Sequence, residues 1–83
     1  MARKPREIRI ERHAKPHSHC VAWTAEPKAS AFTGLVSSEE KARALRELHG
    51  AIRQDGCDPL ACEIVWAYIE EGWGWIARVR EPA

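Results

Sequence analysis

The sequence predicts a single small α+β domain, in which one helix covers one face of an antiparallel sheet. Segments near both ends of the chain alternate apolar and charged residues with a period of two, as half-buried strands do. A central segment, at about 38–54, repeats its apolar residues with helical spacing. The chain has 83 residues, which is enough for one domain. We expect the element order β-β-β-α-β-β, with residues 1–5 as a flexible lead-in and residues 6–83 as the domain.

Three candidate strands precede the helix. Charged residues alternate with Ile8 and Ile10 over residues 7–12, which is the pattern of a strand with one buried face. Residues 20–25 and residues 30–36 are the second and third candidates, each interrupted afterwards by turn-forming or helix-starting residues.

The helix is predicted from a start signal and an apolar stripe. Ser37 and Glu40 have the Ser-x-x-Glu spacing of a capping box, in which two side chains satisfy free backbone N–H groups of the first turn. Gly56 follows the last helical residues and is expected to end the helix. The expected apolar stripe consists of Ala42, Leu45, Leu48, His49 and Ile52.

Residues 59–71 fit two structures. Asp58 and Pro59 have the residue types of a helix start. Residues 64–69, in contrast, are rich in β-branched and aromatic residues, which favour a strand. We favour the strand, paired as a hairpin with residues 73–80, because a single C-terminal strand would be hard to place in the sheet.

Charge is distributed unevenly along the chain. The formal net charge is +1, yet residues 1–20 carry a charge of +4 and the remainder carries −3. A basic arm on an acidic body fits contact with a phosphate backbone or with an acidic protein surface. The ordinary alternative is a solvated, charged N-terminal segment.

Four tryptophans are a high aromatic content for a chain of this size. We expect Trp23 and Trp75 to belong to the core, whereas Trp66 and Trp73 fit the core and an interface equally well. Trp73 lies beside the expected hairpin turn, so we expect it to be the most exposed of the four. An exposed tryptophan is a typical anchor of a protein interface.

Neither a metal site nor a catalytic site is indicated. Histidines and cysteines gather at residues 13–20 and at residues 57–62, but their spacing does not match that of structural zinc sites. We therefore expect no metal and no other cofactor. Candidate zinc ligands, should the two groups meet, are His17, His19, Cys57 and Cys62. Gly-rich phosphate loops, paired carboxylates and nucleophile elbows are not recognisable, so we expect a protein that is not an enzyme.

The sequence also bears on location. Its longest apolar run, residues 64–69, is much shorter than the about 20 residues of a membrane-spanning helix, and the N-terminus does not resemble a secretory signal. We therefore expect a cytoplasmic protein with no membrane partner and with reduced cysteines.

In size, composition and element order, the chain resembles the small anti-CRISPR proteins encoded by phages and mobile elements. The resemblance extends over the whole chain but includes no diagnostic motif, so no functional residue is carried over. It implies a non-enzymatic inhibitor in the cytoplasm of a bacterial host, which blocks a CRISPR surveillance complex by covering the surface of an effector subunit. The alternative function is a small nucleic-acid-binding protein that uses a basic strand and an exposed tryptophan.

The expected binding surface combines the first strand with the C-terminal hairpin. Its residues are Arg9, Arg12, Trp73, Arg78 and Arg80. We expect the first and last strands to be neighbours, because the arginines would then form one basic ridge on the open face of the sheet, with a tryptophan at its end.

Overall fold

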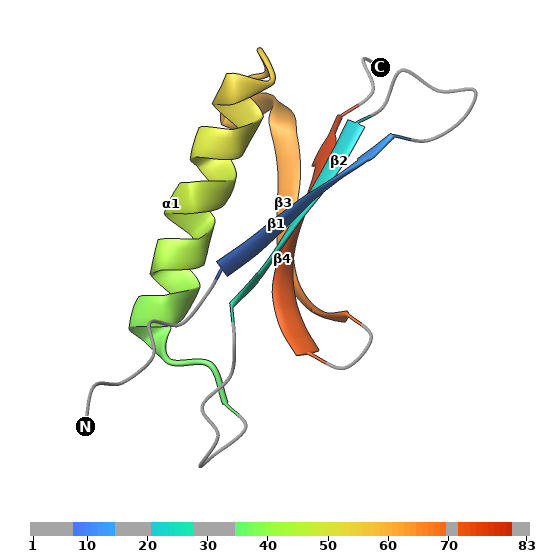
Figure 1. Cartoon of the computed structure of the whole chain (residues 1–83). Helices are drawn as coiled ribbons and strands as arrows, with labels where there is room; N and C mark the ends of the chain where they lie inside the picture. Colours follow the sequence, from blue (N-terminus) through green and yellow to red (C-terminus); the bar gives the residue numbers. More distant parts are fainter. Residues whose placement is uncertain (1–7, 15–20, 28–34, 70–71, 81–83) are drawn as a thin grey trace.

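The computed structural model contains one helix packed on one face of a four-stranded antiparallel sheet (Figure 1). The structure describes residues 8–14, 21–27, 35–69 and 72–80. Its elements are β1 (Ile8–Ala14), β2 (Val21–Pro27), α1 (Ser38–Gln54), the short 3-10 helix η1 (Pro59–Ala61), β3 (Cys62–Ile69) and β4 (Gly72–Val79). The predicted α+β class and the single small domain are confirmed.

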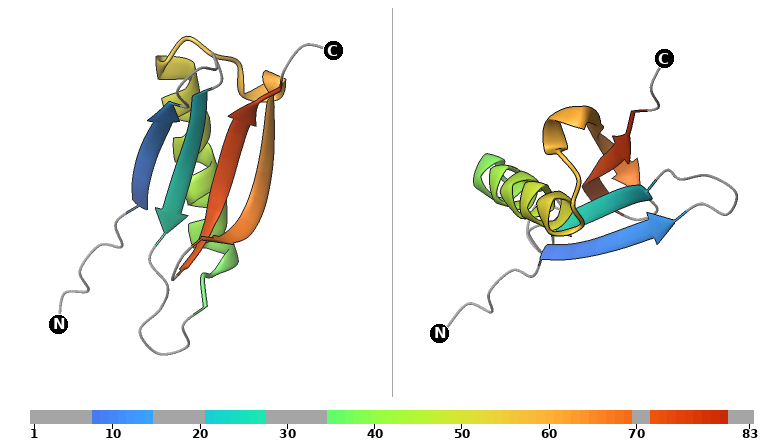
Figure 2. Two further views of the ribbon diagram at one scale, coloured as in Figure 1. Left: turned by 90° about the vertical axis from the view of Figure 1, so that its right-hand side faces the viewer. Right: turned by 90° about the horizontal axis from the view of Figure 1, so that it is seen from above.

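The strands lie in the order β1-β2-β4-β3, and each neighbouring pair is antiparallel. Figure 2 (left) shows this order, with β2 and β4 in the centre and β1 and β3 at the two edges of the described sheet. Helix α1 runs along one face of the sheet, chiefly over β2. The opposite face of the described sheet is not covered by the helix, and we call it the open face.

The expected element order needs one correction. The described part of the chain has two strands before the helix, not three. Of the predicted third strand, residues 30–34 lie outside the described residues, and Leu35 and Val36 form no regular secondary structure. Leu35 and Val36 directly precede Ser37, the N-cap of α1, and the chain is too close to the start of the helix there to continue as a strand.

Helix α1 begins and ends at the predicted residues. The Ser37 hydroxyl accepts a hydrogen bond from the backbone N–H of Glu40 at 3.2 Å, which caps the first turn. After the last turn, Gly56 has a φ of +81°, a conformation that glycine adopts without strain. Its backbone N–H donates to the Arg53 carbonyl at 2.9 Å, so the helix closes with a satisfied end.

The buried stripe of α1 differs from the expected one at one alanine. Ala44, Leu48 and Ile52 are buried, at spacings of four, and Leu45 is half-buried beside them. Ala42 is exposed, so its predicted place in the core is wrong. Both alanines fit the sequence pattern, and the position of the helix over β2 decides which one faces the sheet.

Residues 62–69 and 72–79 form the predicted antiparallel pair of strands. The helix-start signal at Asp58 and Pro59 produces only the single turn η1, whose first free N–H, that of Leu60, donates to the Asp58 carboxylate at 2.9 Å. From Cys62 onward the chain is extended, as the β-branched and aromatic residues favour. The strand interpretation of this segment is therefore confirmed.

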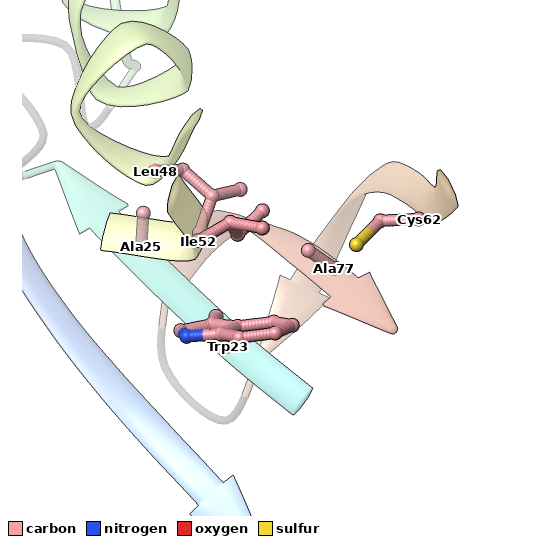
Figure 3. Packing of buried hydrophobic residues seen from close by; sticks show 6 residues of the cluster. All are labelled: Trp23, Ala25, Leu48, Ile52, Cys62 and Ala77. Carbon is pink, nitrogen blue, oxygen red and sulfur yellow. The ribbon is translucent and has the colours of Figure 1, made fainter. Parts of the chain in front are cut away.

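The core lies between α1 and the two central strands (Figure 3). Trp23 of β2 is 1% exposed and is, with Leu48 and Ile52, one of the largest fully buried side chains. Its indole N–H donates to a carboxylate oxygen of Asp55 at 2.6 Å, and Asp55 is the residue that ends α1. This hydrogen bond joins the centre of the sheet to the end of the helix, and it satisfies the one polar group of the tryptophan.

Leu48→Ala should lower the free energy of unfolding by about 2–5 kcal/mol, because it removes a fully buried side chain and leaves a cavity. Leu60 is 89% exposed, so the same change there, Leu60→Ala, is the matched control and should alter stability by less than about 0.5 kcal/mol. Urea titrations of both variants measure the difference. Similar losses in the two variants would contradict the assigned core.

Asp55→Ala should cost about 1–3 kcal/mol, because the buried indole N–H of Trp23 then has no acceptor. Asp55→Asn keeps an oxygen at this position and loses only the charge, so we expect it to lose less than half as much. Urea titrations again provide the measurement. An equal loss in the two variants would mean that the charge, and not the hydrogen bond to Trp23, stabilises this contact.

Gly74 of β4 allows a close approach of the backbone. A Cβ atom at this position would lie 2.8 Å from the Ala25 carbonyl oxygen and 3.1 Å from side-chain atoms of Glu26 and Ile69. A Cβ at Gly50, on the exposed side of α1, would meet nothing within 4 Å. The sheet therefore requires glycine at position 74, whereas the helix does not require it at position 50.

Gly74→Ala should lower stability by about 1–3 kcal/mol, because the new methyl group has to displace backbone. Gly50→Ala should raise stability by about 0.5–1 kcal/mol, since alanine costs less conformational entropy in a helix. Thermal melts of the two variants should move in opposite directions. A stabilising Gly74→Ala would show that β2 and β4 approach each other less closely here.

Candidate functional site

The sheet does not assemble the predicted basic ridge. Strand β2 lies between β1 and β4, so the expectation that the first and last strands are neighbours is wrong. The pair of β1 and β2 has two outer edges, and β4 pairs with the edge of β2. The choice between the two edges depends on contacts that are distant in sequence, which strand patterns do not show.

The two arginines of β1 lie on opposite faces of the sheet. Arg9 is on the open face and forms an ion pair with Glu11. Arg12 pairs with Trp23 across β1 and β2, so it lies on the helix side. Its Nε atom is 3.3 Å from the Asp55 oxygen that also accepts the Trp23 hydrogen bond. Arg12 therefore contributes to the contact between sheet and helix, and not to a surface shared with Arg9.

The arginines of the C-terminal hairpin are also separated from β1. Arg78 lies on the open face, directly opposite Ala22 on one side and Glu63 on the other. Arg80 is exposed and follows β4, and its backbone N–H donates to the Ala61 carbonyl at 3.1 Å. A shallow hollow of about 150 Å³ on this face is lined by Glu63, Val65, Ile76 and Arg78.

The open face carries both signs of charge in alternation. Its ionisable residues on the described strands are Arg9, Glu11, His13, Glu26, Glu63 and Arg78. His13 is placed by Thr24, whose hydroxyl lies 3.2 Å from the His13 Nε2 atom. Because acidic side chains lie among the basic ones, this face does not offer the continuous positive surface that a phosphate backbone favours.

The helix side of the β3–β4 hairpin carries four aromatic residues, which we call the aromatic cluster: Trp66, Tyr68, Trp73 and Trp75. Trp66 is directly opposite Trp75, and Tyr68 is directly opposite Trp73. In an antiparallel pair of strands, directly opposite residues alternate between hydrogen-bonded and non-hydrogen-bonded pairs. The backbone N–H of Arg80 donates to the Ala61 carbonyl, so these two residues form a hydrogen-bonded pair. In the observed register, both aromatic pairs are therefore non-hydrogen-bonded pairs. Side chains approach most closely at such positions, which favours ring contacts.

The rings of the aromatic cluster form a continuous chain of contacts. Tyr68 and Trp73 meet edge to face, with ring centroids 5.6 Å apart. Trp73 stacks on Trp66 at 6.4 Å with an interplanar angle of 10°, and Trp66 meets Trp75 edge to face at 5.0 Å. Offset stacking and edge-to-face contacts are the two arrangements that aromatic rings prefer.

One end of the aromatic cluster is fixed to α1. The indole N–H of Trp75 donates to the Lys41 carbonyl in the first turns of the helix at 2.9 Å. The Lys41 ammonium group lies over the rings of Trp66 and Trp75, 4.9 Å and 5.4 Å from their centroids. These distances are within the range of cation–π interactions. The helix therefore holds the inner rings in place.

The other end of the aromatic cluster is open to solvent. Tyr68 is 60% exposed and Trp73 is 43% exposed. Trp73 stacks on the inner ring of Trp66, and Tyr68 in turn contacts the ring of Trp73. The expected exposure of Trp73 and the expected burial of Trp23 are confirmed. Trp75 is half-buried and packs against the core, and Trp66 is half-buried as well.

Sequence reasoning did not single out Tyr68 or Lys41. A signal for Tyr68 was present, because Trp66 and Tyr68 have the same two-residue spacing as Trp73 and Trp75. In a hairpin with a tight turn, two such pairs face each other. Lys41 has no comparable signal, since its contact with the rings depends on where α1 packs on the sheet.

The histidines and cysteines assemble no metal site within the described residues, where no three potential ligands come together. Of the candidate zinc ligands, His17 and His19 lie outside the described residues. Cys57 and Cys62 are free thiols at the start of the hairpin. Burial, with smaller contributions from Cys57 and Asp58, raises the pKa of the Cys62 thiol. Cys62 therefore stays protonated at neutral pH, which suits a core residue and not a nucleophile.

No protein-family model, curated protein or solved structure matches this chain. Within the described residues, α1 is not long and apolar enough to cross a membrane. What the fold and the site define is a small α+β domain with an aromatic cluster that is bonded to α1 at one end and exposed at the other.

Proposed function

We propose that this chain is a small, non-enzymatic protein-binding domain, and that the exposed end of the aromatic cluster anchors its partner. The observation that carries the proposal is the exposure of Tyr68 and Trp73 on rings that are already held in position. Tryptophan and tyrosine are the residues that most often dominate the binding energy of protein interfaces.

Preorganisation supports this function. A side chain that becomes ordered on binding costs about 0.5–1.5 kcal/mol. Trp73 is stacked on Trp66, and the inner rings are tied to α1 through Lys41, so little further ordering is needed. A partner would gain the apolar contact of the two exposed rings without this cost.

The resemblance to anti-CRISPR proteins supplies a specific partner. In this proposal, the aromatic cluster binds a protein subunit of a CRISPR surveillance complex and blocks the complex by covering that subunit. Protein binding suits the mixed charge of the open face, because mimicry of a DNA duplex would need a strongly acidic surface.

Nucleic-acid binding is the second candidate, and one observation favours it. An aromatic cluster with exposed rings at one end and a lysine at the other resembles the stacking platforms that hold single-stranded bases. The position of the charge counts against it, because the Lys41 ammonium group lies over the inner rings and not beside Tyr68 and Trp73. Gel shifts at several salt concentrations separate the two functions, since phosphate contacts weaken steeply with salt.

Trp73→Ala should weaken partner binding by at least about 2 kcal/mol, the loss expected for a central aromatic anchor. A tagged chain first captures its partner from a lysate of phage-infected bacteria, and calorimetry with the purified partner then measures the affinity. For the anti-CRISPR activity, the measurement is phage plaquing on a CRISPR-immune host that expresses each variant. The wild-type chain should restore plaquing and Trp73→Ala should not.

Arg78→Ala is the matched control, because Arg78 lies on the open face of the same strand. It should leave partner affinity and plaquing unchanged. The opposite pattern, in which Arg78→Ala abolishes binding and Trp73→Ala does not, would move the interface to the open face and overturn the proposed anchor. Circular dichroism of both variants confirms that the fold is retained.

A further inference from the structure

Among the described residues, strand β3 presents a backbone edge that no other strand pairs with. It is the last strand of the described sheet and pairs only with β4 there. Because Ala61 bonds to Arg80, every second residue from Ala61 onward also bonds to its partner on β4. The backbone groups of the odd-numbered residues of β3 therefore face β4. The N–H and C=O groups of Ile64, Trp66 and Tyr68 therefore point away from β4, toward the edge.

This edge lacks the usual protection against strand pairing. Natural sheets guard their edges with charged residues, prolines or bulges. At the other edge, β1 carries such charges at Arg9, Glu11 and Arg12. Strand β3 has eight residues and a single charge, that of Glu63. The edge of β3 is therefore suited to accept another strand.

Apolar side chains beside the edge are exposed on both faces of the sheet. Val65 is 45% exposed on the open face, and Tyr68 is 60% exposed on the helix side. A strand added at this edge would cover part of both residues. Exposure on two faces is expected of a strand whose neighbour is missing, since a binding site on one face would expose residues on that face alone.

Strand β3 is also complementary to itself. Two copies of β3 can pair antiparallel about a two-fold axis that is perpendicular to the sheet, and side chains that lie opposite each other are then on the same face. The N–H and C=O groups that point outward from one copy meet those of the other copy. The axis can pass beside Val65 or beside Trp66. In these two registers Glu63 lies opposite Ala67 or opposite Ile69 of the copy, so like charges do not meet. A net charge of +1 adds little repulsion between two chains.

From these observations we infer that the edge of β3 is a dimer interface, and that its occupant is β3 of a second copy of this chain. The two four-stranded sheets join into one continuous antiparallel sheet with both helices on the same face. The second copy would cover part of Tyr68, but Trp73 lies on β4, one strand away from the edge, so the dimer leaves this tryptophan of the proposed anchor available. The inference does not depend on the proposed function.

Sedimentation velocity of the purified chain over a range of concentrations tests the dimer. The wild-type chain should pass from monomer to dimer as its concentration rises. Val65→Lys adds a charge at the edge and should raise the dimer dissociation constant about tenfold or more. Val65→Thr is the matched control, because it keeps a β-branched side chain and adds no charge, so it should dimerise nearly as the wild type does.

Amide hydrogen exchange of the wild-type chain gives a second and residue-specific test. The amides of Ile64, Trp66 and Tyr68 should exchange more slowly at high protein concentration, whereas those of Val65 and Ala67 already bond to β4 and should change little.

Three outcomes would overturn the inference. They are a monomer at all concentrations, a dimer that is equally tight in Val65→Lys, and exchange at Ile64 and Trp66 that does not depend on concentration. Trp73→Ala should leave the dimer intact. Loss of partner binding without loss of the dimer in that variant therefore separates the two proposals.

Discussion

The contact between Trp23 and Asp55 is the constraint on which the rest of the structure depends. A buried tryptophan supplies a large apolar surface, but its N–H group needs an acceptor. Asp55 provides that acceptor from the residue that ends α1, and Arg12 approaches the same oxygen from the edge strand. Because β2 is central, this one position fixes the helix against the sheet, and the helix in turn fixes Lys41 over the rings of the hairpin.

The molecule thus separates two uses of its aromatic residues. Trp23 stabilises the core and is nearly inaccessible, whereas Trp73 and Tyr68 lie on the hairpin and face solvent. Trp75 connects the two groups, since it belongs to the aromatic cluster, where it contacts Trp66, and also packs against the core. The hairpin can present exposed rings in a fixed position because their inner neighbours are tied to α1.

Local features were predictable from the sequence, and long-range ones were not. The helix bounds follow from Ser37 and Gly56, and the hairpin follows from β-branched residues, because both depend on neighbours within a few positions. The order of the strands depends on pairing between residues about fifty positions apart. Arg12 is an intermediate case. It has the same parity as Ile8 and Ile10, so alternation alone places it on the helix side, away from Arg9.

The sheet order also affects how the chain folds during its synthesis. Strand β4 lies between β2 and β3 but follows both of them in the sequence. Until the ribosome has released β4, β2 and β3 have no common neighbour, and the core side of Trp23 lacks Ala77. Strand pairing over long sequence separations is slow to form, so we expect the nascent chain to remain open until β4 has emerged, and then to fold in one cooperative step.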